Sequence, residues 1–334
     1  MNKVQLPDNL IDTLQNSQDI LCISHVGPDG DAVGSLLGIG YILDYLGKNP
    51  TLSLQDKLTD SIVETVGADK IVGPDQVADS YDLIVVLDAS SPDRMGSVFR
   101  ESVHKDIPLV VIDHHVTNTY FGAINWVAPD CAATCQMLVY LADALHVPLE
   151  GPLAEVLLTG LTTDTLGFRT SNTDDRVLEA AMRLTRGGGS LPDITARTLN
   201  RRPFSVLQLW GKALQNVQLE DGVIWATVTH DQWADVGRPE GDIRLSSTLI
   251  TAAEADMSAA FTEIIGGDDQ PYVGCSFRAK PTFDVSKVAF ELDGGGHPAA
   301  SGCTVPGELT ETVQRIVGLL KQARQAQLSD GSSE

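Results

Sequence analysis

Residues 82–88 read DLIVVLD and residues 108–113 read PLVVID. Both runs are short, β-branched and apolar on both faces, which is typical of strands covered on both sides in a parallel sheet. Two further runs, DILCISHV at 19–26 and TLSL at 51–54, flank a glycine-punctuated helical pattern at 34–47. This alternation of strands and helices predicts a doubly wound α/β domain with a mainly parallel sheet.

The remaining sequence predicts a second, smaller mixed α/β domain. Helical patterns at 131–146, 152–163 and 174–186 complete the first domain, expected at 1–188. GGGS and two prolines then interrupt the pattern and predict a linker at 189–204. The second domain is expected at 205–328 and a disordered tail at 329–334. Its expected elements are helix 205–217, strand 223–229, helix 243–253, strands 257–265 and 272–280, helix 284–292, strand 300–305 and helix 308–326.

Composition excludes several classes of protein. The chain has 334 residues, of which 43% are hydrophobic, and a formal net charge of −22. This charge disfavours duplex DNA as a partner, because duplex binding needs many contacts from Lys and Arg to phosphates. Neither a membrane span nor a signal peptide is evident, so we expect a cytoplasmic protein. The five cysteines are odd in number and form no CxxC pair, which favours reduced thiols.

The loop after the first predicted strand concentrates metal-binding side chains. Residues 24–32 read SHVGPDGDA, so His25, Asp29 and Asp31 lie within a few residues of one another at the carboxyl end of the strand. Ligands of open α/β sheets bind at this edge. An imidazole with two carboxylates suits a divalent ion such as Mn²⁺. Taken alone, the loop fits equally well with aspartates that cap the next helix.

Acidic residues recur at the ends of other predicted elements. Asp88 ends one apolar strand, the triplet Asp113-His114-His115 ends another, and Asp164 follows a helical run. Buried charges are costly unless they are paired or bound to metal, so this recurrence indicates a divalent metal site. Asn118 is a further candidate for orienting a ligand or the substrate. The sequence contains neither GxSxG nor GxxxxGK[ST], which argues against a serine hydrolase or a P-loop NTPase.

These segments resemble the four motifs of the DHH phosphoesterase superfamily. The sequence GGGHPAASG at 294–302 is similar to the signature of its companion domain, DHHA1. The resemblance covers about residues 10–325, and the size and domain order match standalone bacterial members. Those members act as nanoRNases and as phosphatases of 3′-phosphoadenosine 5′-phosphate (pAp). The resemblance therefore implies a two-metal phosphoesterase whose first domain carries the metals and whose second domain binds substrate.

The resemblance also implies a role for individual residues. His25 and Asp29 would hold one ion, Asp31, His114 and Asp164 the other, and Asp88 would bridge the two. His115 would face the scissile phosphate, with Asp113 supporting it. In the second domain Arg278, Gly294, Gly295, Gly296 and His297 would bind the substrate's phosphates. The sequence Asp164-Thr165-Leu166-Gly167 departs from the family's commoner Asp-Thr-Gly, which puts only the local loop shape in doubt.

We therefore expect a hydrolase of short oligoribonucleotides or of pAp. It would use two divalent ions, Mn²⁺ before Mg²⁺ or Co²⁺. Family members often form dimers, which favours a homodimer. One alternative is a phosphodiesterase of cyclic dinucleotides, of the c-di-AMP type. An alternative of another class is a non-catalytic nucleotide-binding regulatory module, although all six expected metal ligands are present. A RecJ-like exonuclease and a family II pyrophosphatase fit less well, because the chain lacks an OB-like extension and carries the GGGH motif.

Overall fold

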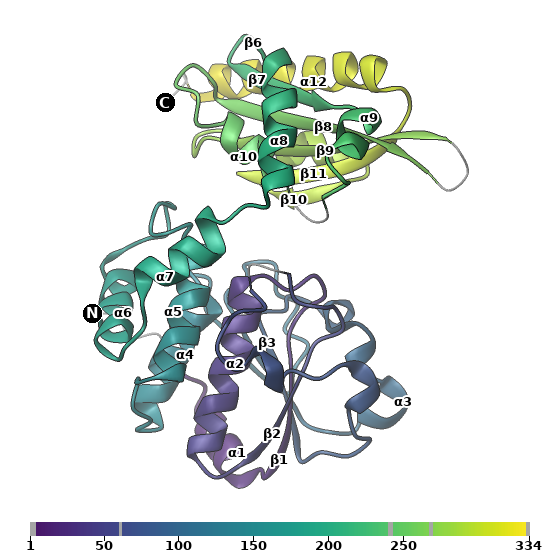
Figure 1. Ribbon diagram of the computed structural model, residues 1–334. Helices are drawn as coiled ribbons and strands as arrows, with labels where there is room; N and C mark the ends of the chain where they lie inside the picture. The colour runs from purple at the N-terminus through teal and green to yellow at the C-terminus, as the bar shows by residue number, and fades with distance from the viewer. Residues whose placement is uncertain (1–4, 60–61, 240–242, 267–269, 332–334) are drawn as a thin grey trace. The chain divides into compact units, whose positions relative to one another are not determined.

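The computed structural model describes residues 5–59, 62–239, 243–266 and 270–331. The chain forms two compact units, Met1–Arg201 and Arg202–Glu334, each with its own hydrophobic core. Figure 1 shows a mainly parallel sheet with helices in the first unit and a mixed sheet with helices in the second. Within the described residues, no helix is both long and apolar enough to cross a membrane.

The first unit contains a parallel sheet in the order β2-β1-β3-β4-β5. Each neighbouring pair of strands is parallel. The strand order reverses between β1 and β3, and such a switch point in an open α/β sheet is where ligands bind, beyond the carboxyl ends of the strands. The strands are β1 (Asp19–Ile23), β2 (Asn49–Ser53), β3 (Leu83–Leu87), β4 (Leu109–Asp113) and β5 (Ile124–Val127).

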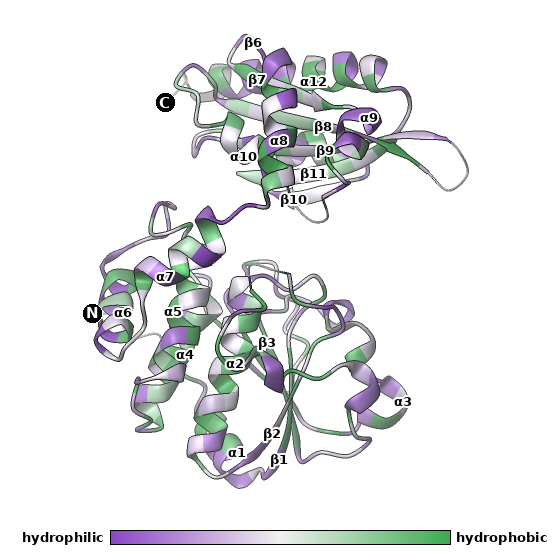
Figure 2. Ribbon diagram, viewed as in Figure 1, coloured by the Kyte–Doolittle hydropathy of each residue, from purple (hydrophilic) through white to green (hydrophobic). Residues whose placement is uncertain are grey.

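Both faces of this sheet are buried, as the continuous apolar runs predict. One face packs against a core shared with helices, and the other packs against residues between Val72 and Ile107. Figure 2 shows mostly hydrophobic colouring along the central strands and hydrophilic colouring on the outlying α3 (Glu101–His104). The helices of the first face are α1 (Leu10–Asn16), α2 (Gly30–Tyr45), α4 (Thr134–Ala144), α5 (Pro152–Asp164) and α6 (Asp175–Arg186).

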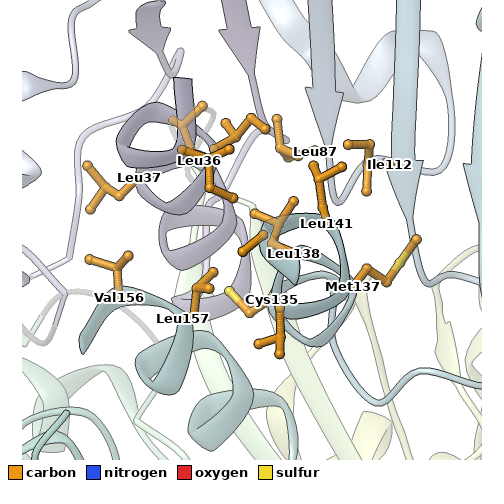
Figure 3. Packing of buried hydrophobic residues seen from close by; sticks show 14 of the residues in the cluster. Leu36, Leu37, Leu87, Ile112, Cys135, Met137, Leu138, Leu141, Val156 and Leu157 are labelled. Atoms are coloured by element: carbon orange, nitrogen blue, oxygen red, sulfur yellow. The ribbon is translucent and has the colours of Figure 1, made fainter. Parts of the chain in front are cut away.

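Glycines allow α2 and α5 to approach very closely. A Cβ at Gly34 would lie 2.6 Å from the Val156 carbonyl oxygen, and one at Gly38 would lie 2.5 Å from the Leu157 side chain. Figure 3 shows Leu36, Leu37, Val156 and Leu157 among the packed side chains of this core, beside Leu138 and Leu141 of α4. Since Asp31 lies in the first turn of α2 and Asp164 ends α5, this packing determines the distance between two site residues.

The second unit contains a mixed six-stranded sheet in the order β10-β11-β9-β8-β7-β6. Neighbouring strands are antiparallel except β7 and β8, which are parallel. One face packs on α11 (Ser286–Glu291) and α12 (Leu309–Gly331), and the other on α8 (Phe204–Ala213) and α10 (Leu245–Leu249). The strands are β6 (Gln218–Glu220), β7 (Val223–Val228), β8 (Met257–Ile265), β9 (Pro271–Ala279), β10 (Gly295–His297) and β11 (Ala300–Pro306).

The α/β fold class is confirmed, but the expected linker and the expected tail differ from the sequence prediction. Most of the expected linker is helical, because α7 (Leu191–Thr195) and the π-helical turn η4 (Ala196–Asn200) belong to the first unit, with Ile194 in its core. The expected tail was wrong at residues 329–331, since α12 continues through them. Good helix formers fill residues 319–328, and no proline ends the helix earlier. Residues 332–334 lie outside the described part of the chain.

Candidate metal centre

The predicted metal-binding side chains meet at the carboxyl edge of the first sheet. His25 follows β1, Asp88 follows β3, and Asp113 is the last residue of β4. Asp164, the last residue of α5, also contributes its carboxylate. Asp88 has a φ of 57°, a left-handed conformation that is uncommon outside glycine and that clusters at functional sites.

The buried Asp88 lies at the centre of this cluster, and its two oxygens face different partners. Oδ2 lies 3.6 Å from His25 Nε2, and Oδ1 lies 3.5 Å from His114 Nε2. The Asp88 side chain is 2% exposed. A carboxylate placed in this way can be shared between two neighbouring ligand sets.

Three further contacts complete these ligand sets. On one side, Asp29 Oδ1 lies 3.9 Å from His25 Nε2. On the other side, His114 Nε2 lies 3.9 Å from Asp31 Oδ2 and 3.3 Å from Asp164 Oδ2. Donor atoms within each triad, His25-Asp29-Asp88 and Asp31-His114-Asp164, lie within 4.8 Å of one another.

The spacing within the triads fits a shared cation better than direct ion pairing. Atoms bound to one octahedral ion at about 2.1 Å lie about 3.0 to 4.2 Å apart, depending on the angle between them. The contacts above, at 3.3 to 3.9 Å, fall within that window. The imidazole and carboxylate donors are also those that divalent transition metals accept. The residues present therefore fit the two-metal arrangement that the resemblance implies.

Asp31 has a second structural role that the sequence did not reveal. It is fully buried, and its carboxylate accepts hydrogen bonds from the backbone N–H groups of Thr134 (2.6 Å) and Cys135 (2.9 Å) at the start of α4. Thr134 Oγ1 also donates to Asp88 Oδ1 at 3.0 Å. The sequence gives only indirect evidence of this role. The N-cap of α4 is Ala133, whose side chain cannot accept a hydrogen bond, so the first N–H groups of α4 need an acceptor from elsewhere.

The capping and metal-binding interpretations of the SHVGPDGDA loop are compatible. Asp29 Oδ1 accepts hydrogen bonds from the backbone N–H groups of Asp31 and Ala32, both at 3.0 Å, and so caps α2. An ionised carboxylate has about four lone-pair sites on its two oxygens, so a carboxylate that caps a helix through one oxygen can still bind an ion. The cap also explains why α2 begins at Gly30, four residues before the predicted helix.

Asp113 orients His115 through a direct hydrogen bond. His115 Nδ1 lies 2.7 Å from Asp113 Oδ1, and the backbone N–H of His115 donates to the same oxygen at 3.2 Å. Asn118 Nδ2 donates to Asp113 Oδ2 at 2.6 Å, so both oxygens of this fully buried carboxylate are bound. Burial opposes ionisation of Asp113, but these hydrogen bonds lower its pKa overall. Asn118 therefore supports the carboxylate that orients His115.

The side chains of the cluster hold more negative charge than their burial favours. Burial, followed by the charge of Asp31, raises the pKa of both Asp88 and Asp164. Burial alone would lower the pKa of His114, but its hydrogen bond to Asp164 and the surrounding carboxylates raise that pKa to about 10. Protons therefore supply the positive charge that the cluster needs. Bound cations would supply it instead.

Arg94 contacts the outer nitrogen of His25. Arg94 Nη2 lies 3.0 Å from His25 Nδ1, and the Val26 carbonyl oxygen lies 2.9 Å from the same nitrogen. A metal on His25 Nε2 requires the proton on Nδ1, which then donates to Val26. Arginine can only donate, so that tautomer would compete with the Arg94 contact. No sequence motif singled out this arginine.

The predicted substrate-binding residues lie together on one edge of the second sheet. In the register of β9, β11 and β10, Arg278 is opposite Ala300, and Ala300 is opposite His297. Directly opposite residues project from the same face of a sheet, so Arg278 and His297 flank a small alanine. The backbone needs glycine at two positions nearby: a Cβ at Gly294 would lie 2.3 Å from the Gly302 carbonyl oxygen, and Gly296 has a φ of 131°.

Comparisons with known proteins agree with this arrangement. The DHH family, N-terminal domain, matches residues 19–161. The chain is 31% identical over 316 residues to the bifunctional oligoribonuclease and PAP phosphatase NrnA of Thermus thermophilus, covering 91% of this chain and 89% of that protein. It is 28% identical over 311 residues to the enzyme of the same name from Bacillus subtilis, covering 89% and 92%.

A solved structure supports the fold. The crystal structure of an exopolyphosphatase-related protein from Bacteroides fragilis matches with a TM-score of 0.85 and 23% identity, covering 94% of this chain and 95% of that one. At that identity the likeness concerns the fold alone. The family match and the NrnA relatives confirm the resemblance carried by the sequence motifs. The chain therefore belongs to the DHH family of phosphoesterases.

Proposed function

We propose that this protein hydrolyses short oligoribonucleotides to mononucleotides and removes the 3′-phosphate of pAp, using two divalent metal ions. The observation that carries the proposal is the buried Asp88, whose two oxygens face the two separate triads. The NrnA relatives from Thermus and Bacillus are named for both activities, which supports the choice of substrates. A phosphoester is the common chemical feature of those substrates.

The two triads would each hold one ion. His25 and Asp29 would bind the first, Asp31, His114 and Asp164 the second, and Asp88 both. When bound, the two ions polarise the phosphoryl oxygens and lower the pKa of water, which provides a nucleophile near neutral pH. The donor mixture of two imidazoles and four carboxylates favours Mn²⁺, with Mg²⁺ and Co²⁺ as weaker choices.

His115 would act on the substrate through its outer nitrogen. Nδ1 is engaged by Asp113, so any action on a phosphoryl oxygen or a leaving hydroxyl would come from Nε2. Burial opposes protonation, but the Asp113 hydrogen bond and the charge of Asp88 raise the pKa of His115. A protonated ring held in this orientation can donate a proton or a hydrogen bond, while Asp113 prevents the ring from turning.

Small substrates fit the charge of the chain better than long nucleic acids. A net charge of −22 repels an extended polyanion, whereas one or two phosphates can be held by local cations. Arg278 and His297 would supply those cations, with close backbone approach at Gly294, Gly295 and Gly296. A homodimer is also part of the proposal, and sedimentation velocity would test it.

Turnover of defined substrates tests the function. We would measure phosphate release from pAp and mononucleotide release from a labelled RNA dinucleotide, with Mn²⁺ and with EDTA. Asp88→Asn should abolish both activities, whereas Asp12→Asn, at an exposed site in α1, should not change them. Absence of metal-dependent product from the wild type would contradict the proposal. Faster turnover of cyclic di-AMP than of either substrate would keep the metal chemistry and overturn the substrate choice.

A further inference from the structure

We propose that Phe290 is the stacking platform for the base of the bound nucleotide. The inference rests on the proposed function, in which Arg278 and His297 hold the phosphates. Phe290 lies at the end of α11, immediately before the glycine-rich turn, and its side chain is 59% exposed. Three observations support a recognition role: a fixed backbone, a position beside the phosphate-binding residues, and an open aromatic face.

The backbone of Phe290 is fixed by the way α11 ends. The N–H of Gly294 donates to the Ala289 carbonyl at 2.8 Å, and the N–H of Asp293 donates to the Phe290 carbonyl at 3.2 Å. Asp293 has a φ of 56°. These two bonds around a left-handed residue form a Schellman motif, which holds the last helical turn in one conformation. The direction of the Phe290 Cα–Cβ bond is therefore fixed, although the ring is exposed.

The ring lies on the face of β10 that carries His297. A Cβ at Gly295 would meet Phe290 Cε1 at 3.8 Å, which places the ring on the side toward which a residue-295 side chain would point. Residues two apart in a strand point to the same face, so His297 projects from that face as well. The register through Ala300 adds Arg278 to it. An aromatic ring, an arginine and a histidine thus share one face of the sheet.

The spacing suits a single nucleotide. Gly295 and His297 are two strand residues apart, about 7 Å. That distance is comparable with the reach from a nucleobase to its own phosphate. Because Gly295 has no side chain, the ring can lie close to the strand there, and its exposed face is left for a base. Stacking accepts any base, since every base has a π face, which matches a substrate class defined by length rather than sequence.

Binding measurements with and without a base test this inference. Isothermal titration calorimetry on the full chain would compare AMP with ribose 5-phosphate, and kinetics would compare pAp with ribose 3,5-bisphosphate. Phe290→Ala should weaken AMP binding and raise the KM for pAp about tenfold, because removing a stacking aromatic has an effect of about that size. The constants for both base-free compounds and the kcat for pAp should stay within twofold. Phe290→Tyr should behave like the wild type.

The matched control is Phe204→Ala, which removes an aromatic ring that is 74% exposed on α8 of the same unit. It should change none of these constants. Equal changes for the base-containing and base-free compounds, or no change with Phe290→Ala, would overturn the inference. So would loss of a dimer by Phe290→Ala with unchanged AMP affinity, because the ring would then belong to a subunit contact. Failure of the wild type to turn over pAp would contradict the proposed function but not the AMP comparison.

Discussion

The carboxyl edge of the first sheet and the β10 edge of the second sheet are built in opposite ways. At the first, Asp31, Asp88 and Asp113 are each at most 2% exposed, and their oxygens are held by backbone N–H groups and neighbouring side chains. At the second, His297 and Phe290 are exposed on an edge strand and a short helix. Under the proposed function, the first region would hold cations and the second would present side chains to a ligand.

This difference implies a division of labour. Buried, mutually bound carboxylates can position metal ions without the substrate, because their geometry depends on the core. A half-buried arginine, an exposed histidine and an aromatic ring beside glycines contribute most when a ligand covers them. Substitutions in the first region should therefore change metal content and kcat. Substitutions in the second should change KM and leave the metals in place.

Asp88→Asn should have the largest effect, because it removes charge from both triads at once. We expect both ions to be lost at equilibrium. Removing a single preorganised electrostatic group from an active site costs on the order of 10³-fold in kcat, and we expect at least that loss here. Metal analysis after dialysis, together with pAp kinetics, would measure it. Normal metal content with normal kcat would show that the Asp88 carboxylate is not shared by two ions.

Asp113→Asn should reduce kcat about 10- to 100-fold, the usual cost of losing a residue that orients a catalytic imidazole. The metals should remain bound, because Asp113 contacts His115 and Asn118 and lies outside both triads. The pH dependence of kcat should change as well, since Asp113 helps to raise the pKa of His115. Loss of metal with no change in the pH profile would show that Asp113 is a ligand.

Arg278→Ala should raise the KM for pAp about tenfold or more, the effect of losing a hydrogen bond to a charged group. Metal content should stay at the wild-type value. Lys280→Ala is a suitable control one residue beyond the same strand, because its side chain donates to the carbonyl oxygens of Ala252 and Ala253. An equal loss of metal in Arg278→Ala would break the proposed separation of roles.

Gly34→Ala should destabilise the first unit by about 1–3 kcal/mol through overpacking. The added Cβ would lie 2.6 Å from the Val156 carbonyl oxygen and 2.9 Å from Cys135 Sγ. Gly211→Ala, in α8 where nothing lies within 4 Å, should be neutral or stabilising by up to about 1 kcal/mol. Urea unfolding followed by far-UV circular dichroism would compare them. Equal stability of the two variants would refute the close-packing argument.

Bound metal should stabilise the folded protein more at high pH than at low pH. Protonated His114 stabilises the metal-free fold fully below its ordinary pKa of 6.5, and this contribution is lost as pH rises through about 10. Asp88 and Asp164 act in the same direction, because their raised pKa values make the ionised forms unfavourable. Saturating Mg²⁺ should therefore raise the Tm by a few degrees more at pH 8.5 than at pH 6.5. A constant shift would contradict this coupling.

The sequence predicted much of the first unit because burial restricts it strongly. Strands covered on both faces must be apolar throughout, so β3 and β4 were evident, and an acid directly after such a strand is conspicuous. The cap that Asp31 provides to α4 could not be predicted, since the two residues in contact are about a hundred positions apart. The same holds for Arg94 beside His25. Such contacts depend on tertiary structure rather than on local pattern.

In the second unit, the residues proposed to bind substrate were harder to predict from the sequence. An arginine in a strand and a histidine after glycines have no distinctive pattern of their own, so Arg278 and His297 were assigned through the family resemblance. The three-residue β10 was missed because its glycines have low strand propensity. Phe290 was overlooked because it occupies an ordinary helical position, and only the structure places its ring beside Gly295.

In the proposed site, Asp88 joins two metal ions. Electron paramagnetic resonance of the wild type titrated with Mn²⁺ tests it most directly, with bound metal counted by equilibrium dialysis. We predict two Mn²⁺ per chain and a spectrum broadened by exchange between the ions, because a shared carboxylate holds them close together. A single bound Mn²⁺, or two with the separate six-line spectra of isolated ions, would contradict the account.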